Sequence, residues 1–101
     1  MLYGISTSPY YTDINSLISL VMKEDEVLLM QDGVLMGHKT FSTNNDNYYL
    51  MQFKNKGIHV FALQDDVEAR GLTPYISSYV CQISFIDFVK LTIKHTQYFS
   101  W

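Results

Sequence analysis

Cysteine is nearly absent from this sequence, and long apolar runs are missing. The single cysteine, Cys81, excludes an internal disulfide framework, and no set of Cys and His residues has zinc-ligand spacing. No stretch approaches the roughly 20 apolar residues of a membrane span, and residues 1–5 (MLYGI) lack the basic start and the cleavage site of a signal peptide. We therefore expect a cytoplasmic protein with no membrane partner.

Charged residues are scarce for a soluble protein. They make up 17% of the chain, against 48% apolar residues, and 15% of the residues are aromatic. Aromatic residues are enriched at interface centres as well as in cores, so we expect a partner to bury part of the apolar surface. A core rich in aromatic residues is the open alternative. With a net charge of −3 and scattered Lys and Arg residues, stable nucleic-acid binding by this chain itself is not expected.

The 101 residues have the length of one domain, and their apolar pattern alternates between strands and helices. The expected strands are residues 1–6, 27–30, 58–63 and 79–83, and the expected helices are residues 14–22, 48–53, 66–70 and 84–95. Strand 27–30 is apolar throughout, which is typical of a parallel strand buried on both faces. This order predicts a single α/β domain over residues 1–101, a small flavodoxin-like sandwich with one parallel sheet flanked by helices.

Helix caps and loops follow from polar residues between these segments. Thr12 is predicted to cap the first helix, Asp65 or Asp66 the third, and Ser84 the last. The charged run 23–26 (KEDE) is expected to be solvated. Residues 34–47 are expected to form a loop without an assigned role.

The last helix is expected to turn an apolar face to the core. That face comprises Phe85, Phe88, Val89, Thr92 and Ile93. Lys90, Lys94 and His95 suit the negative end of the helix dipole, so we interpret them first as helix stabilisers. The aromatic tail, Tyr98, Phe99 and Trp101, is too short for another helix. It either folds back on the core or fills a partner's groove.

Chemistry in parallel α/β sheets sits beyond the carboxyl ends of the strands. Asp32, Asp65 and Asp66 follow such ends and could form an acidic Mg²⁺ site, but the first strand ends without a carboxylate and no Lys follows a strand. The glycines fit neither a dinucleotide fingerprint nor a P-loop. We therefore expect no nucleotide, flavin or metal cofactor.

Histidine and cysteine are the remaining candidates for chemistry. His38, His59 and His95 lie in three different elements, and we interpret each as structural. Cys81 could carry persulfide sulfur, because a thiolate is the natural carrier. Its place inside strand 79–83 predicts burial and an inert thiol, so Cys81 is the only candidate catalytic residue and a structural role is preferred.

Several segments together resemble the DsrH/TusB family. They are Ser8-Pro9 after the first strand, residues 28–34 (LLMQDGV), residues 60–63 (VFAL) followed by Asp66, residues 69–72 (ARGL), residues 87–95 (DFVKLTIKH) and the terminal Trp101. Their order and spacing cover almost the whole chain, although residues 36–47 have no counterpart in the pattern.

The resemblance implies a DsrEFH-type fold and a non-catalytic subunit of a TusBCD-like complex. It implies TusC-like and TusD-like partners in a heterohexamer, a dimer of heterotrimers, which relays persulfide sulfur from TusA to TusE for 2-thiolation of the tRNA wobble uridine. In the family, the sulfur-carrying cysteine belongs to the TusD-like partner. Some DsrH proteins carry a cysteine near the first helix, where this chain has Ser16, Leu17, Ser19 and Leu20. A sulfurtransferase that bears persulfide on Cys81 is the alternative.

Overall fold

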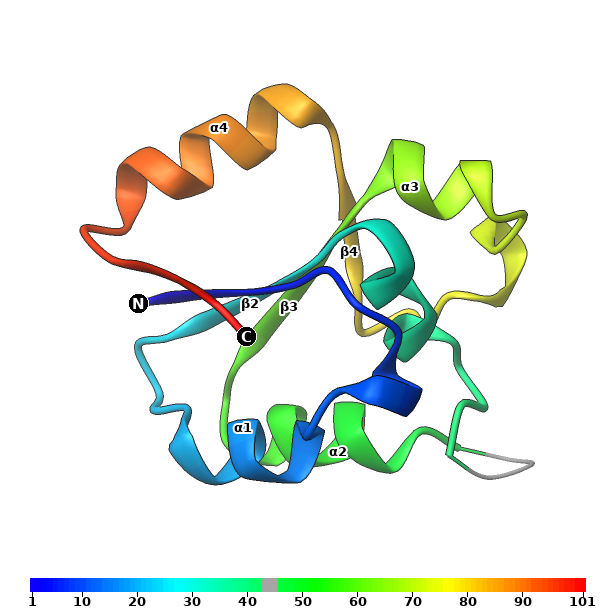
Figure 1. The fold of residues 1–101 in the computed structure, drawn as a ribbon, viewed down its shortest axis with the longest axis horizontal. Helices are drawn as coiled ribbons and strands as arrows, with labels where there is room; N and C mark the ends of the chain where they lie inside the picture. Colours follow the sequence, from blue (N-terminus) through cyan, green and yellow to red (C-terminus); the bar gives the residue numbers. More distant parts are fainter. Residues whose placement is uncertain (43–45) are drawn as a thin grey trace.

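The computed structural model describes residues 1–42 and 46–101 and contains a five-stranded parallel sheet with helices on both faces (Figure 1). The strands are β1 (Leu2–Ile5), β2 (Glu26–Leu29), β3 (His59–Leu63), β4 (Cys81–Ile83) and β5 (Tyr98–Ser100). The helices are α1 (Ile14–Leu20), α2 (Tyr48–Asn55), α3 (Gln64–Ala69) and α4 (Phe85–Lys94), with 3₁₀ turns η1 (Pro9–Tyr11), η2 (Gln31–Gly37) and η3 (Thr73–Tyr75). The predicted α/β fold is confirmed, and β5 is an additional strand.

The strand order, β4-β3-β2-β1-β5, explains why the two faces of the sheet are covered unequally. From β1 to β4 the chain steps toward one edge, so right-handed crossovers place α1, α2 and α3 on one face. The larger core lies there, and Leu17, Phe53 and Val67 are its fully buried contributions from these three helices. The step from β4 back to β5 crosses the sheet in the other direction and carries α4 over the opposite face.

On the opposite face, which we call the α4 face, the helix that packs against the sheet is α4, while α1 and α2 lie on the other side (Figure 1). The buried cluster of the α4 face is small and comprises Leu2, Leu28 and Ile83. Phe88 and Leu91 of α4 pack against this cluster and are themselves only partly buried. The burial of the apolar side chains on this side of the sheet therefore depends on one helix of ten residues.

Two of the predicted helix caps are wrong. Asp13, not Thr12, caps α1, with its Oδ1 accepting a hydrogen bond from the Ser16 amide at 3.0 Å. Neither Asp65 nor Asp66 caps α3, because both lie inside its first turn, where carboxylates suit the helix dipole. The cap predicted at the start of α4 is confirmed, since the hydroxyl at position 84 accepts from the amide of residue 87 at 3.2 Å.

The segment predicted as a loop, residues 34–47, is partly ordered by buried contacts. Its first residues belong to η2, in which Val34, Met36 and Gly37 are buried. Asn47 is 2% exposed, and its amide nitrogen donates to the carbonyl oxygens of Met36 and His38 at 2.7 and 2.8 Å. Its side-chain oxygen caps α2. Residues 43–45 of the predicted loop lie outside the described residues.

The aromatic tail folds back onto the sheet. Residues 98–100 form β5, which pairs in parallel with β1, and the Trp101 indole N–H donates to the Asp13 carbonyl at 2.9 Å. Gly4 leaves room for the Tyr98 ring, because a Cβ at that position would overlap the Tyr98 hydroxyl. Tyr98 and Phe99 nevertheless remain about half exposed, at 47% and 48%. Of the two alternatives that the sequence left open for the tail, the structure shows the tail folded back on the core, with part of each ring exposed.

Candidate functional site

Cys81 lies in strand β4, as the sequence predicted, but it is exposed, and the prediction of a buried thiol is wrong. The reason is topological. β4 is an edge strand that pairs only with β3, and the α4 face beside it is incompletely covered. Among the described residues the thiol has no hydrogen-bond or ion-pair partner. An apolar strand pattern predicts pairing, but it does not say whether the strand lies at the centre or at the edge of the sheet.

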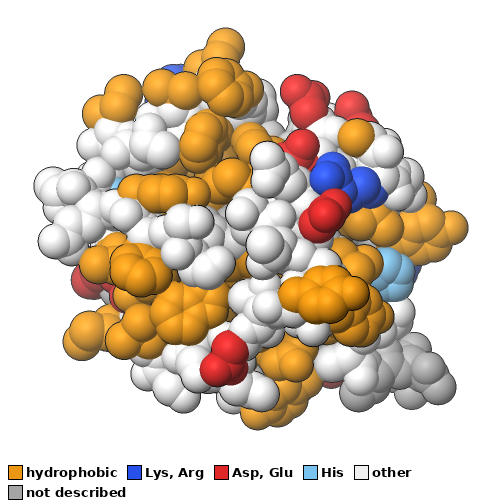
Figure 2. Space-filling model, in the orientation of Figure 1, with side chains coloured by type: hydrophobic (Ala, Val, Ile, Leu, Met, Phe, Trp, Pro, Cys, Tyr) orange, Lys and Arg blue, Asp and Glu red, His pale blue; other side chains and the backbone are white. Residues whose placement is uncertain are grey.

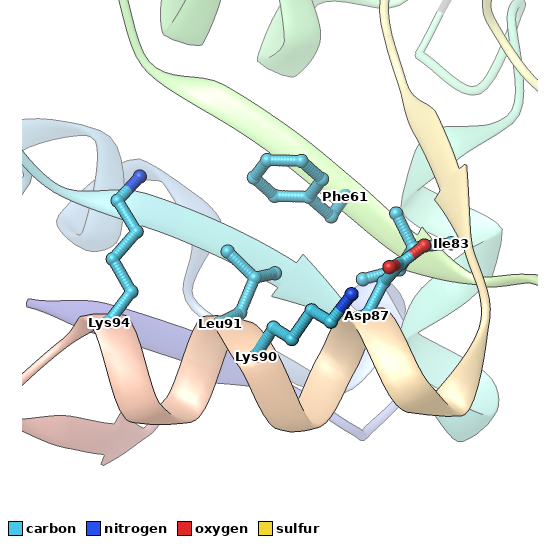
Figure 3. A pocket seen from close by; sticks show the side chains of 6 residues that line it. All are labelled: Phe61, Ile83, Asp87, Lys90, Leu91 and Lys94. Carbon is cyan, nitrogen blue, oxygen red and sulfur yellow. The ribbon is translucent and has the colours of Figure 1, made fainter.

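A groove beside α4 runs past Cys81. One hollow, of about 250 Å³, lies between α4 and the sheet, with Phe61, Ile83 and Leu91 as its apolar floor and Lys90, Lys94 and Asp87 at its rim (Figure 3). A second hollow, of about 340 Å³, continues from Phe61 to Cys81 and is also lined by His59, Val60 and Tyr79. Because both hollows share Phe61, we treat them as one surface and call it the Phe61 groove.

The outer side of α4 is also apolar, contrary to the prediction that residues 85, 89 and 93 face the core. Phe85, Ile86, Val89 and Ile93 are 63%, 68%, 39% and 78% exposed. We call these four side chains the α4 stripe, and Figure 2 shows apolar side chains gathered over α4 at the top left of the molecule. Of the predicted face, Phe88 packs inward, together with Leu91. A helix that is apolar on both sides is typical of a helix buried in an assembly.

A buried carboxylate at the amino end of β2 holds the end of α4 to the sheet. Glu26 is 5% exposed, although the run 23–26 was expected to be solvated. Its Oε1 lies 2.7 Å from His95 Nε2 and 2.9 Å from Lys94 Nζ, and its Oε2 lies 3.3 Å from His59 Nδ1. Lys94 and His95 are therefore more than dipole stabilisers, and two histidines that the sequence treated separately converge on one acid.

The environment of Glu26 favours its ionised form. Burial opposes ionisation most strongly, but hydrogen bonds from His95, Lys94 and His59 outweigh it and lower the Glu26 pKa below its ordinary 4.5. In the sequence, the visible sign of this cluster around Glu26 is that an acidic residue directly precedes the apolar strand 27–30. Parallel pairing in register, Glu26 with His59, then brings the two side chains to the same face.

At the carboxyl ends of the strands, two of the three candidate carboxylates are neutralised within the chain. The Arg70 guanidinium lies 3.0 Å from Asp32 and 3.9 Å from Asp66, and Asp66 also accepts a hydrogen bond from the Gln31 amide at 2.7 Å. Asp65 is exposed and takes no part in these contacts. The third histidine, His38, lies apart from both clusters and stacks on Tyr75, with ring centroids 5.7 Å apart. In the described residues no group of three or more His, Cys, Asp and Glu side chains is placed to hold a metal ion.

The chain resembles known proteins along its whole length. Residues 7–98 match the family described as DsrH like protein. The chain belongs to the DsrH family. It is 42% identical to Protein TusB of Photorhabdus laumondii, of Escherichia fergusonii and of Escherichia coli strain SMS-3-5, in each case over 101 residues and 100% of both chains.

Solved structures show the same fold for this DsrH-family chain. The crystal structure of the ychN protein from E. coli superposes with a TM-score of 0.75 at 14% identity, covering 99% of this chain and 97% of that chain. The MTH1491 protein from Methanobacterium thermoautotrophicum superposes with a TM-score of 0.72 at 16% identity, covering 99% and 96%. No helix in the described part of the chain is both long and apolar enough to span a membrane.

Proposed function

We propose that this chain is a non-catalytic subunit of a TusBCD-like complex that passes persulfide sulfur from TusA to TusE, for 2-thiolation of the tRNA wobble uridine. The full-length identity of 42% to Protein TusB is the observation that carries the proposal. Membership of the DsrH family supports the wider assignment to tRNA modification by sulfur relay. The chain acts as one domain in the cytoplasm, and it needs no cofactor.

The structure supports an assembly role in two ways. The α4 stripe leaves large apolar side chains in solvent on a chain that has few charges. In addition, the residues that line the hollow next to Cys81 are His59, Val60, Phe61 and Tyr79, and no Lys or Arg that would favour a thiolate is among them. The chain therefore works through TusC-like and TusD-like partners in a heterohexamer, a dimer of heterotrimers, and meets TusA and TusE through that complex. It does not itself bind tRNA stably.

Co-expression tests the proposed function. With TusC-like and TusD-like partners we expect one stable complex, and native mass determination is expected to show two copies of each subunit. The chain made alone is expected to be poorly soluble or to self-associate, because its apolar surface stays open. A well-behaved monomer that ignores both partners would contradict the proposal.

A second function rests on the exposure of Cys81, which makes a sulfurtransferase with persulfide on this thiol sterically feasible. If the thiol carries sulfur, Cys81→Ser abolishes wobble-uridine thiolation in cells that depend on this gene. If the chain is non-catalytic, thiolation stays at the wild-type level, and that is our expected result. Mass spectrometry of digested tRNA measures the thiolated fraction, and the amount of co-purified complex shows whether the variant still assembles.

A further inference from the structure

We propose that residues 85–101, which comprise α4, β5 and the link between them, open from the sheet as one unit while the rest of the domain stays folded, and that Glu26 is the latch that keeps them closed. We call residues 85–101 the C-terminal strap. Its opening uncovers the buried cluster of the α4 face, Leu2, Leu28 and Ile83, and frees the edge of β1. This motion belongs to the chain itself, so it depends neither on a partner nor on sulfur chemistry.

The C-terminal strap covers the sheet with partly exposed side chains. No residue of α4, all of which the structure describes, is buried, and its inward side chains, Phe88 and Leu91, pack against the sheet only partly buried (Figure 3 shows Leu91). Strand β5 is exposed at all three positions. In contrast, α1, α2 and α3 each give the larger core a fully buried apolar side chain. Segments that bury little apolar surface open at a lower free energy than the core.

The rest of the domain holds together without the C-terminal strap. Strands β1 to β4 are neighbours in one sheet, and α1, α2 and α3 supply the helical side of the larger core. The strap leaves this body at Ser84, the one residue between β4 and α4. Because β5 lies at the outer edge beside β1, its departure breaks no other strand pair. A rotation about Ser84 therefore suffices to open the strap.

Two fastenings hold the C-terminal strap at separate points. Where α4 ends, Lys94 and His95 lie 2.9 and 2.7 Å from the Glu26 carboxylate on β2. At the end of the chain, the Trp101 indole donates to the Asp13 carbonyl at 2.9 Å, and β5 pairs with β1 over three residue pairs. Only the short link 95–97 separates α4 from β5. Loss of either fastening therefore loosens both elements.

The Glu26 contact is the stronger latch, because it is shielded from water. In the described part of the chain, the side-chain hydrogen bonds between the strap and the body are those of Glu26 and Trp101, apart from the Ser84 cap at the hinge. Glu26 is 5% exposed and the His95 side chain 7% exposed, so water replaces this contact only when the strap moves away. The stabilisation that Glu26 provides therefore belongs to the closed state.

Hydrogen–deuterium exchange of the full chain at low concentration, measured by mass spectrometry of proteolytic fragments, tests the C-terminal strap. After correction for intrinsic rates, the slowest amides of residues 85–101 are expected to exchange at least about tenfold faster than those of β2 and β3. Equal protection of strap and sheet would overturn the proposal, because a domain that opens only as a whole exposes all its slow amides in the same event.

Val67→Ala distinguishes opening of the strap from opening of the whole domain. Val67 is fully buried in the larger core, on the other face of the sheet from α4. Its truncation leaves a cavity there and is expected to accelerate the slow amides of β2 and β3 about tenfold. The amides of the C-terminal strap are expected to change less than about twofold, since the strap opens while the core stays folded. Equal acceleration of strap and sheet would overturn the proposal.

Glu26→Gln and Trp101→Ala loosen the two fastenings separately. Each is expected to accelerate the amides of both α4 and β5 at least about fivefold, because the two elements leave the sheet together. Glu24→Gln, at an exposed acid two residues from Glu26, is the matched control and is expected to change neither element. If α4 does not respond to Trp101→Ala, opening as one unit is overturned. If the strap does not respond to Glu26→Gln, or responds equally to Glu24→Gln, the latch is overturned.

Discussion

Replacement of Glu26 with Ala is expected to lower the free energy of unfolding by about 2 kcal/mol, and the Tm by about 10 °C. The substitution removes the acceptor for His95, whose side chain is only 7% exposed, and leaves that imidazole without its partner inside the protein. Contributions from Lys94 and His59 are smaller, because their side chains are 63% and 75% exposed and solvent replaces the lost contact. Urea unfolding of the full chain at low concentration measures the change.

Glu24→Ala is the control for this prediction. Glu24 is an exposed acid two residues away, and its removal is expected to change the free energy of unfolding by less than about 0.5 kcal/mol. Equal effects of the two substitutions would show that the buried cluster adds nothing to stability beyond the general charge of the segment.

The lowered pKa of Glu26 gives the same prediction a pH dependence. A carboxylate with a folded pKa below its unfolded value stabilises the protein fully above the unfolded pKa and loses that contribution as pH falls through the folded pKa. The stability gap between wild type and Glu26→Gln is therefore expected to have its full size above about pH 4.5 and to shrink as the pH falls below that value. A gap of constant size across this range would contradict the direction of the shift.

The sequence predicted the elements of the fold well, because each depends on local patterns. Strand β2 is apolar at three of its four positions, and all four are buried, as a central parallel strand requires. Helix α2 ends at Asn55, shortly before Gly57, whose φ of 75° suits the glycine stop of a helix. Helix α1 begins at the predicted residue, Ile14, with Asp13 in place of Thr12 as its cap, and it ends at Leu20, two residues before the predicted end.

The exposure of Cys81 and of the α4 stripe was harder to predict, because it depends on the order of the strands in the sheet. The sequence could not show that β4 lies at an edge of the sheet beside an incompletely covered face, which is why Cys81 is exposed and not buried. The same strand order places α4 on the α4 face, away from α1 and α2, so an apolar pattern that predicts core contacts instead yields the exposed α4 stripe. Composition did indicate a surplus of apolar surface, and the structure shows where that surface lies.

Gly33→Ala is expected to have a larger effect than Glu26→Ala, lowering the free energy of unfolding by more than about 3 kcal/mol. Gly33 is buried in η2, and a Cβ there would overlap the backbone carbonyl of Ile5 in β1. That carbonyl cannot move aside easily, because it accepts a hydrogen bond from the Met30 amide at 2.9 Å. The soluble yield of the variant and its urea midpoint measure the loss.

The expected loss of stability in Gly33→Ala comes from a steric overlap and not from an unfavourable backbone conformation. A substitution at a second glycine tests this distinction. Gly33 does not have a positive φ; the residue of this segment that does is Gln31, at 50°. Gly57 has a φ of 75° and nothing within 4 Å of an added Cβ, so Gly57→Ala carries only the conformational penalty of about 1 kcal/mol. A similar loss in both variants would mean that the contact with Ile5 relaxes and that close packing of η2 on β1 is not what requires glycine at position 33.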